Sequence, residues 1–435
     1  MKVFKFGGAS IKDADSIKNV AAILEQFKDE SLVIVVSALG KTTNAMEAVV
    51  AAHARQDGTA RSLFEEVKQT HYQLMQELFE PDAEIFTTIN DTLVEAEWIL
   101  DEAPEENYDY MYDQIVSMGE LLSTNILAAF LNKIGLPTQW LDARDVIFTD
   151  NTYREGWVIW DKTKEQAVKV VQPMLKKGGF VLTQGFIGST TENFTTTLGR
   201  EGSDYSAAIF SHCLDAEEMV IWKDVPGVLN ADPRLFENTI KLDRLSYREA
   251  IEMTYYGAQV IHPKTIKPLQ NKSIPLWVKS FIDPAGSGTE ISSDQEDTYP
   301  PIVVVEKNQV LLHISTKDYS FVAEHHMARL FERLSDLRLF VNSMQNTAIS
   351  FTICVTEIAD RIDTFILDIS DDFKVKKEDG LELITLRHYT EEAIQSLKKG
   401  KIVLFEERIR NTLQMVVKDV PVIQRREVEL ARTKG

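Results

Sequence analysis

The sequence predicts an α/β protein in which a mostly parallel sheet lies between helices and a smaller α+β region follows. Continuous apolar runs such as Leu32–Val36 and Val220–Trp222 are typical of parallel strands that are buried on both faces. Such strands alternate with helical patterns over roughly the first 290 residues, as a sheet covered on both faces requires. Polar or Gly-rich turns follow the strands, at the edge where open α/β sheets bind ligands.

The first of these turns follows the strand Val3–Phe6, which carries Lys5. Gly7 and Gly8 come next and allow backbone amides to approach a ligand closely. The turn GGAS, which ends at Ser10, lacks the G-x-G-x-x-G spacing of a dinucleotide fingerprint. By itself it indicates either a phosphate-binding turn or a simple tight turn.

The strand Leu32–Val36 leads into a polar segment that begins at Ser37 and includes Thr43. The letters GKT at residues 40–42 imitate the end of a Walker A loop. The first glycine of that motif would fall on Val35, so we favour a substrate-facing loop over a P-loop.

The segment Thr195–Asp204, with the sequence TTTLGREGSD, predicts a polar, hydroxyl-rich hairpin that leads into an Arg-x-Gly-Ser-Asp turn and then a helical pattern. Gly202 and Ser203 would leave backbone N–H groups free at a helix start, where anions bind. Arg200 offers a planar fork that matches a carboxylate, and Asp204 can accept an ammonium or orient a lysine. Helix capping by Ser203 and Asp204 is the structural alternative. The pattern favours an amino-acid ligand.

Further charged residues lie near a predicted helix start or at the end of a predicted strand, where they could contact a ligand. Glu120 lies near the start of a predicted helix, where it either caps the helix or holds a substrate ammonium. Lys223 and Asp224 end the strand Val220–Trp222, and Arg234 adds a basic group nearby in sequence.

Composition narrows the classes of function. The chain has 435 residues, 44% hydrophobic and 26% charged, and a net charge of −20, which argues against nucleic acid or an anionic membrane as partner. Cys213 and Cys354 fit buried thiols and not a disulfide or metal framework. We expect no signal peptide after Met1 and no bilayer-spanning run, and therefore a cytoplasmic protein.

The last third of the chain changes character. A linker rich in Pro, Gly, Ser and acidic residues is expected at residues 291–301, between a first domain at 1–290 and a β-rich region at 302–435. The patterns predict strands and helices at Ile302–Glu306, Gln309–Ser315, Glu324–Leu334, Ala348–Val355, Leu381–Leu386 and Glu391–Lys398. We expect this region to regulate or to dimerise.

Seven motifs in this order resemble the aspartate kinase family: KFGGAS, SALGKTTN, SMGE, TTTLGREGSDYSAA, WKDVPG, ADPR and GAQVIHP. The resemblance covers nearly the whole first two thirds of the chain. It implies the amino acid kinase (carbamate kinase-like) fold followed by tandem ferredoxin-like ACT domains, which regulate the enzyme and make a homodimer. The second ACT unit, at about 381–418, looks shortened.

The resemblance also assigns roles to residues. Lys5 and Asp204 would be catalytic, with Asp204 organising Lys5 and the substrate amine. L-aspartate would contact Ser37, Thr43, Glu120, Arg200 and Ser203, with Arg200 on the α-carboxylate. ATP would contact Lys5, Gly7, Gly8, Ser10, Lys223, Asp224, Leu229, Arg234 and Gln259.

The implied reaction moves the γ-phosphoryl of ATP to the β-carboxylate of L-aspartate and gives 4-phospho-L-aspartate, the entry step to lysine, threonine and methionine. A carboxylate with a pKa near ~4 is already an anion at neutral pH, so it needs alignment and charge neutralisation and no general base. The sequence offers no protein metal site, which fits Mg²⁺ arriving with ATP.

Several positions depart from the family pattern. Ala9 stands in place of a threonine, Lys223 in place of a threonine, Gln259 in place of a lysine and Leu229 in place of a tyrosine. We hypothesise that Lys223 supplies the charge lost at Gln259.

In the ACT region Asn342 and Ala348 replace common acidic residues, so feedback inhibition by lysine or threonine is left open. Two alternatives remain. One is a kinase of another amino acid, such as glutamate or N-acetylglutamate, although an amine contact through Glu120 disfavours an N-acylated substrate. The other is a catalytically weak amino-acid sensor, which only Ala9 and Gln259 favour.

Overall fold

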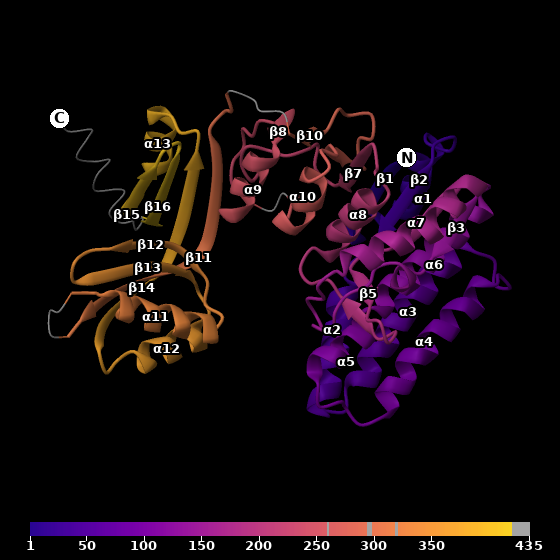
Figure 1. Cartoon of the computed structure of the whole chain (residues 1–435), viewed down its shortest axis with the longest axis horizontal. Helices are drawn as coiled ribbons and strands as arrows, with labels where there is room; N and C mark the ends of the chain where they lie inside the picture. The colour runs from indigo at the N-terminus through magenta and orange to yellow at the C-terminus, as the bar shows by residue number, and fades with distance from the viewer. Residues whose placement is uncertain (259–260, 294–297, 318–320, 420–435) are drawn as a thin grey trace. The chain divides into compact units, whose positions relative to one another are not determined.

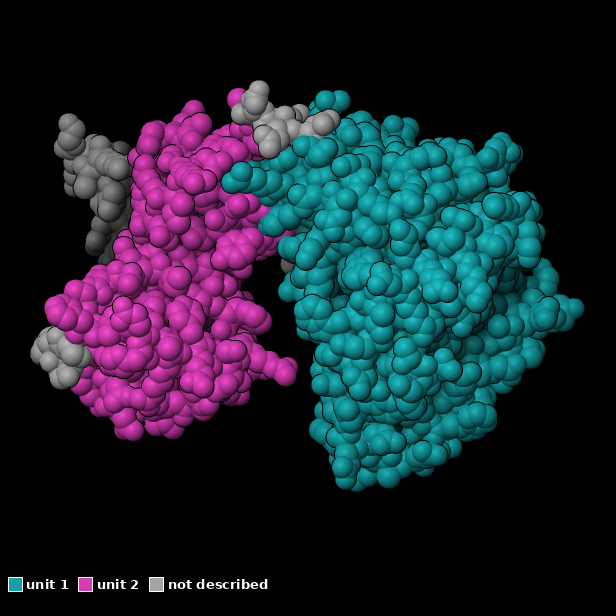
Figure 2. Space-filling view, in the orientation of Figure 1, with its two compact units in different colours: residues 1–228, 241–251, 259–296 teal, residues 229–240, 252–258, 297–435 magenta. Residues whose placement is uncertain are grey.

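The structure is a computed structural model that describes residues 1–258, 261–293, 298–317 and 321–419. The chain divides into two compact units, which Figure 2 colours separately. The first comprises residues 1–228, 241–251 and 259–296, and the second comprises residues 229–240, 252–258 and 297–435. Each unit has its own sheet and its own core.

An eight-stranded sheet forms the centre of the first unit, in the order β3-β4-β2-β1-β7-β9-β10-β8. The neighbours from β3 to β9 pair in parallel, whereas β9 and β10 are antiparallel. The register places Lys5 of β1 between Val35 of β2 and Ile221 of β7. The predicted parallel sheet is thus confirmed. Its strands are β1 (Lys2–Phe6), β2 (Leu32–Val36), β3 (Thr138–Leu141), β4 (Phe180–Gln184), β7 (Glu218–Lys223), β8 (Arg244–Ser246), β9 (Leu276–Ser280) and β10 (Thr289–Ser292).

Helices cover this sheet (Figure 1). The side chain of Asp13 caps the first helix by accepting a hydrogen bond from the backbone N–H of Ser16 at 2.8 Å. The helices α3 and α4 follow one another between Ala60 and Asp101. The helices are α1 (Ala14–Glu25), α2 (Thr42–Arg55), α3 (Ala60–Leu78), α4 (Ile85–Asp101), α5 (Tyr108–Val116), α6 (Met118–Lys133), α7 (Trp160–Lys177), α8 (Gly202–Cys213), α9 (Tyr247–Tyr255) and α10 (Pro263–Gln270).

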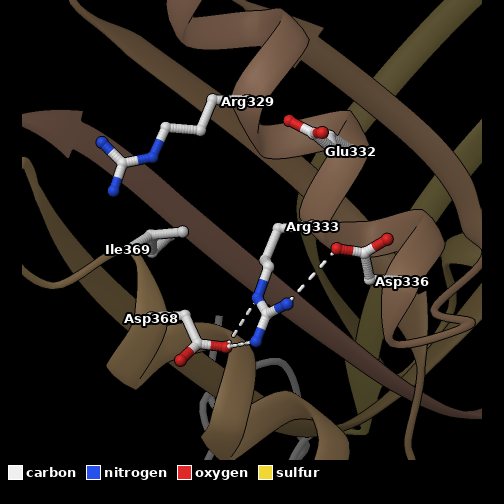
Figure 3. Close-up of a pocket in the computed structure, with 6 residues that line it drawn as sticks. All are labelled: Arg329, Glu332, Arg333, Asp336, Asp368 and Ile369. Atoms are coloured by element: carbon white, nitrogen blue, oxygen red, sulfur yellow. Dashed lines mark hydrogen bonds and ion pairs between the residues drawn. The ribbon is translucent and has the colours of Figure 1, made fainter.

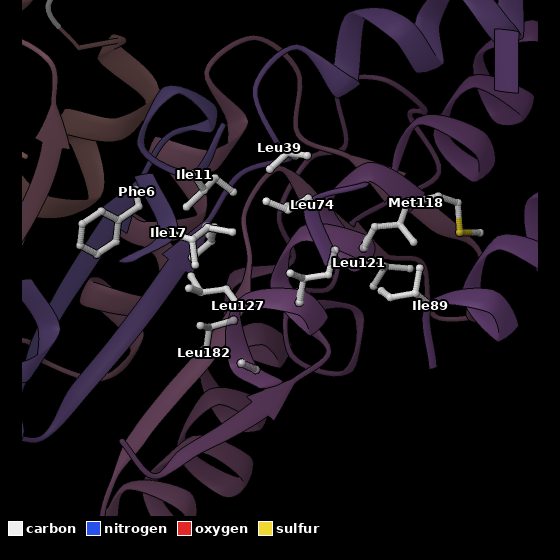
Figure 4. Close-up of a cluster of buried hydrophobic side chains, with 14 of the residues drawn as sticks. Phe6, Ile11, Ile17, Leu39, Leu74, Ile89, Met118, Leu121, Leu127 and Leu182 are labelled. Atoms are coloured by element: carbon white, nitrogen blue, oxygen red, sulfur yellow. The ribbon is translucent and has the colours of Figure 1, made fainter. Parts of the chain in front are cut away.

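The core lies between the sheet and the helices, where side chains from both layers interdigitate (Figure 4). Phe6 of β1 and Leu182 of β4 share this cluster with Ile17 of α1 and Leu121 of α6. Burial of these apolar side chains fixes where the ends of the strands and the first turns of the helices lie.

The helical stretch Tyr108–Lys133 is long and apolar enough, by length and composition alone, to cross a membrane. However, 83% of its most apolar window is buried inside the protein. The stretch comprises α5 and α6, and their burial in the core of the first unit explains its apolar composition.

The polar segment ahead of α8 forms a hairpin. Strands β5 (Ile187–Ser189) and β6 (Thr195–Thr197) pair antiparallel, with Ile187 opposite Thr197. Two short 3₁₀ helices, η1 (Gly8–Ile11) and η2 (Ala143–Asp145), complete the unit. The hydroxyl-rich hairpin predicted ahead of the Arg200 turn is confirmed.

The second unit is built on a six-stranded antiparallel sheet in the order β12-β13-β11-β14-β16-β15. Two strands that were expected to be separate, 302–306 and 309–315, are one long strand, β11, whose register shifts between Glu306 and Gln309. The strands are β11 (Ile302–Thr316), β12 (Val341–Asn346), β13 (Ser350–Thr356), β14 (Phe373–Arg387), β15 (Lys401–Ile409) and β16 (Thr412–Asp419).

The order of elements in this unit repeats a ferredoxin-like plan. Strands β11 and β14 enclose α11 (Glu324–Asp336), β12, β13 and α12 (Ala359–Asp368), which is a β-α-β-β-α-β sequence. The remaining half has one helix, α13 (Glu391–Lys398), beside β15 and β16. This fits an ACT-like first half and a shortened second half.

A cavity of about 320 Å³ lies at α11 and α12 and is lined by Arg329, Glu332, Arg333, Asp336, Asp368 and Ile369 (Figure 3). The guanidinium of Arg333 donates to Asp368 at 2.7 Å through Nε and pairs with Asp336 at 3.3 Å. Arg329 pairs with Asp372. Both arginines of this cavity are therefore matched by carboxylates of the same unit.

Candidate active site

Four strands of the first sheet end at the same edge, where polar loops are tied to one another. The N–H of Ser37, after β2, donates to the carbonyl of Phe6 in β1 at 3.1 Å. The N–H of Gly185, after β4, donates to the carbonyl of Val36 at 2.9 Å. Strand β7 ends at Lys223 beside them. This edge is where parallel α/β sheets bind ligands.

The glycine turn after β1 is packed too closely for any side chain at its second position. A Cβ on Gly8 would lie 2.7 Å from the carbonyl oxygens of Ala38 and Gly40, and the N–H of Gly40 donates to the carbonyl of Gly8 at 3.1 Å. A Cβ on Gly7 would lie 3.4 Å from the ammonium nitrogen of Lys5. The backbone of the turn and a cation therefore meet at one place, which suits a phosphate group.

Ser10 follows the turn and is buried. Its backbone N–H donates to the carbonyl of Gly7 at 2.9 Å. Its hydroxyl oxygen has no hydrogen-bond partner within the described part of the chain. A buried hydroxyl without a partner is unusual in a folded protein, so this group fits a contact with a bound molecule.

Lys5 and Asp204 form a buried ion pair. Nζ of Lys5 lies 2.7 Å from Oδ1 of Asp204, and the two side chains are 12% and 5% exposed. Burial alone would raise the pKa of Asp204, but the charges of Lys5 and Lys223 outweigh it and hold that pKa below its usual value. Asp204 is therefore an anion at neutral pH that pairs with the Lys5 ammonium.

Lys223 joins this pair from the neighbouring strand. Lys5 is opposite Ile221 in the register, and Lys223 lies two residues further on the same face of the sheet. Its charge contributes to the low pKa of Asp204. Two lysines thus share one carboxylate at this edge. Asp224, the next residue, is exposed.

Glu120 is a buried carboxylate in the first turn of α6. Only 2% of the residue is exposed, and this burial raises the pKa of its side chain to about 8. Hydrogen bonds from the backbone of Ala38 and from the Thr43 side chain act in the opposite direction. Its Oε2 has no partner within the described residues. An ammonium group would satisfy this oxygen and return the carboxyl to its charged form.

The start of α8 differs from the capping alternative. The N-cap is Glu201, in the left-handed conformation with φ 54, and no side chain caps the helix. Ser203 and Asp204 instead lie inside the first turn and are buried. A Cβ on Gly185 would lie 2.5 Å from the Cβ of Ser203, so the loop after β4 packs directly on this turn.

Arg200 lies just ahead of α8 on an exposed loop, after Gly199 with φ 77. Its guanidinium has no ion-pair or hydrogen-bond partner that involves described residues. Ser37 and Thr43 are half-buried at the ends of β2 and the start of α2. The structure thus assembles Lys5, Gly7, Gly8, Ser10, Ser37, Thr43, Glu120, Arg200, Ser203, Asp204, Lys223 and Asp224 within the first unit.

Two predicted nucleotide residues are not part of this assembly, and a third lies outside the described residues. Leu229 and Arg234 belong to the second unit. The side chain of Arg234 is 78% exposed and pairs with Asp232 at 2.7 Å. Gln259 lies outside the described residues. The roles of these three residues remain predictions.

One buried group escaped the sequence analysis. Asp113 of α5 is fully buried, and its carboxylate accepts hydrogen bonds from Thr197 and from the backbone of Arg154. The only signal in the sequence was an acidic residue among the apolar positions of a core helix.

No group of three or more His, Cys, Asp or Glu side chains suited to a metal ion occurs in the described residues.

Comparison with known proteins identifies the family of the chain. The model of the amino acid kinase family matches residues 1–280. The chain therefore belongs to the amino acid kinase family.

Relatives narrow this class to the aspartokinases. The chain is 30% identical over 394 residues to lysine-sensitive aspartokinase 3 of Escherichia coli, covering 88% of this chain and 86% of that protein. It also superposes on two crystal structures of aspartokinase III from E. coli. One, in complex with lysine and aspartate in the T-state, has a TM-score of 0.82, 27% identity and 97% and 96% coverage of the two chains. The other, in complex with aspartate and ADP in the R-state, has a TM-score of 0.80, 26% identity and 96% coverage of both.

Proposed function

We propose that this protein is an aspartate kinase, which transfers the γ-phosphoryl of ATP to the β-carboxylate of L-aspartate and gives 4-phospho-L-aspartate. This reaction is the first step towards lysine, threonine and methionine. The buried Lys5–Asp204 pair beside the glycine turn is the observation that carries the proposal. The aspartokinase relatives support it independently.

The residues divide the work between the two substrates. Glu120 would offer the substrate ammonium its Oε2, which has no hydrogen-bond partner among the described residues. Arg200, on its exposed loop, would offer its planar guanidinium to the α-carboxylate. Ser37, Thr43 and Ser203 line the same strand and helix ends. These contacts leave the β-carboxylate as the reacting group, which is already an anion at neutral pH.

The glycine turn and the lysines would neutralise the charge of the phosphoryl group. Lys5, oriented by Asp204, and the amides of Gly7 and Gly8 would meet the phosphoryl oxygens, where negative charge must be neutralised in the transition state. Mg²⁺ would arrive bound to ATP and would supply part of the charge neutralisation on its phosphates. Lys223 would add a second cation, whereas Asp224, Leu229, Arg234 and Gln259 would surround the nucleotide.

We propose the following organisation for the whole protein. Residues 1–290 form the catalytic domain, 291–301 the linker and 302–435 a tandem ACT-like region that regulates the enzyme and forms a homodimer. Lysine is the ligand of the T-state relative and is the first regulator to test. We expect a cytoplasmic enzyme.

Acyl-phosphate formation tests the function. The protein is incubated with Mg-ATP and L-aspartate, L-glutamate or N-acetyl-L-glutamate, and the acyl phosphate is trapped with hydroxylamine. Turnover of L-aspartate supports the proposal, and preferred turnover of another acid contradicts it. No turnover of any acid, with a rise in melting temperature on addition of lysine or threonine, would instead favour the sensor.

A further inference from the structure

The buried carboxylate of Asp113 joins two segments that are distant in sequence. It belongs to α5 and is 0% exposed. Its Oδ1 accepts from the hydroxyl of Thr197 at 2.7 Å, and its Oδ2 accepts from the backbone N–H of Thr197 and of Arg154, both at 2.9 Å. Bonds to a buried anion are short and strong, so this group fixes both segments against α5.

Thr197 is the last residue of β6 and lies three residues ahead of Arg200. The carbonyl of Thr197 accepts a hydrogen bond from the N–H of Gly156 at 2.8 Å. Gly156 lies in the same loop as Arg154, which Asp113 also binds, so this loop and Asp113 both hold Thr197. Gln114 of α5 adds a bond from its side chain to the carbonyl of Thr195 at 2.8 Å. The segment that leads to Arg200 is therefore anchored before the exposed turn begins.

We propose that Asp113 is a positioning residue for the amino-acid substrate, because it holds Thr197 and thereby sets where Arg200 presents its guanidinium. This inference rests on the proposed function and assigns Asp113 to the binding of aspartate, with no direct contact to either substrate. An error of about 1 Å in a group that binds substrate is enough to weaken its interaction strongly. Nucleotide binding, which depends on the other side of the site, should not change.

The charge of Asp113 makes this role sensitive to pH. Burial raises the pKa of Asp113 to about 6, against the effect of its hydrogen bonds from Arg154 and Thr197. The ionisable groups around it are Tyr112 on α5, whose hydroxyl donates to Glu47 of α2 at 2.6 Å, and Tyr153 and Arg154 on the facing loop. A protonated carboxyl offers a donor where an acceptor is needed. The KM for aspartate should therefore rise as the pH falls through about 6.

Stability should respond to pH in the opposite direction. A folded pKa above the unfolded value of 3.8 means that the folded protein binds the proton more tightly, so stability through this group is greatest at low pH and falls as the pH rises through about 6. Weaker aspartate binding at pH 5 thus cannot be attributed to loss of this group's contribution to folding.

The test compares Asp113→Asn with Asp109→Asn. Asp109 lies one helical turn earlier on α5 and is exposed, with one 3.4 Å contact to the guanidinium of Arg154. For Asp113→Asn we expect the KM for aspartate to rise about tenfold, because a buried donor loses its charged acceptor, while kcat and the KM for ATP stay within about twofold. The pH dependence of the aspartate KM near 6 should disappear. Asp109→Asn should behave as wild type.

A second pair keeps the inference testable if Asp113→Asn does not fold. Thr197→Val removes only the hydroxyl bond to Asp113, whereas Thr197→Ser keeps it. We expect a raised aspartate KM in the valine variant and a normal one in the serine variant. A normal aspartate KM in Asp113→Asn or Thr197→Val, or an equal rise in the KM for ATP, would overturn the inference. An inactive wild type would instead overturn the proposed function.

Discussion

The two units treat their charged groups differently. In the first unit, a carboxylate oxygen of Glu120 and the hydroxyl of Ser10 are buried at the edge of the parallel sheet, and neither has a hydrogen-bond partner among the described residues. In the second unit, Arg329 and Arg333 are matched by carboxylates of α11, of α12 and of the segment that follows α12. Unsatisfied buried polar groups are costly for folding and mark the place where a ligand completes the structure.

Asn342 is a second example of a polar side chain in the second unit whose hydrogen bonds are made within that unit. Its side-chain amide donates to the oxygens of Gln309 at 2.8 Å and Thr356 at 2.9 Å. The amide of Asn342, which stands where the family commonly has an acidic residue, is thus used in hydrogen bonds within the second unit. Substitutions at the sheet edge of the first unit should therefore change substrate binding and turnover. Substitutions in the α11–α12 cavity should change turnover and stability only slightly.

The largest effect short of removing Lys5 is expected for Asp204→Asn. Without this anion, Lys5 and Lys223 repel each other and Lys5 loses its 2.7 Å partner. We expect kcat to fall about 100-fold or more, since misplacing a charged group in the transition state has effects of that size. Steady-state rates of acyl-phosphate formation measure it. The control is Asp215→Asn, an exposed residue just beyond the other end of α8. Equal losses in both would show that helix stability, and not the position of Lys5, is at stake.

Glu120→Gln should act on aspartate binding and on stability together. We expect the KM for aspartate to rise at least about tenfold, because an ion pair with the ammonium is replaced by a neutral contact. The pKa of Glu120 is raised from 4.5 to about 8, so its contribution to wild-type stability is fully present below pH 4.5 and declines as the pH rises to about 8. Chemical unfolding at pH 5 and pH 8 should show this decline in the wild type and a smaller one in the variant. A parallel pH response in both would contradict the assignment.

Lys223→Thr tests whether this lysine supplies nucleotide charge. We expect the KM for ATP to rise several-fold, on the order of one lost charged contact, with the KM for aspartate unchanged. Initial rates at varied ATP measure the effect. Lys162→Thr serves as control, because this lysine lies over the ring of Phe148, 3.8 Å from its centroid. An unchanged KM for ATP in Lys223→Thr would refute the hypothesis.

The smallest effect is expected for Arg333→Ala in the second unit. Its side chain is 39% exposed, and surface ion pairs of this kind contribute little to stability. Denaturant unfolding should therefore shift little, and turnover of aspartate should not change. A large loss of activity would mean that this cavity takes part in regulation.

The sequence alone could predict which residues meet where they belong to one short motif. Lys5, Gly7 and Gly8 lie within four residues at the end of one strand, so their spacing alone predicts their meeting place. The pairing of Lys5 with Asp204 needed the family resemblance, because the two lie in different motifs. Helix capping by Ser203 was a reasonable alternative, but the left-handed Glu201 starts α8 without a side-chain cap.

Long-range contacts were not predictable in the same way. Asp113 and Thr197 are separated by 84 residues, and nothing in either local pattern points to the other. The long strand β11 was divided in two because Lys307 and Asn308 resemble a turn. The positive φ of Asn308, at 56, is instead accommodated where the register shifts.

The most direct test of the account compares Lys5→Ala with Lys2→Ala in acyl-phosphate formation from Mg-ATP and L-aspartate. Both lysines lie on β1, but Lys2 pairs with Glu30 at 2.9 Å and Glu218 at 3.2 Å, away from the carboxyl end of the strand. We predict that Lys5→Ala lowers kcat by about 1,000-fold or more, whereas Lys2→Ala retains wild-type turnover. Full turnover of L-aspartate by a folded Lys5→Ala protein would contradict the central claim.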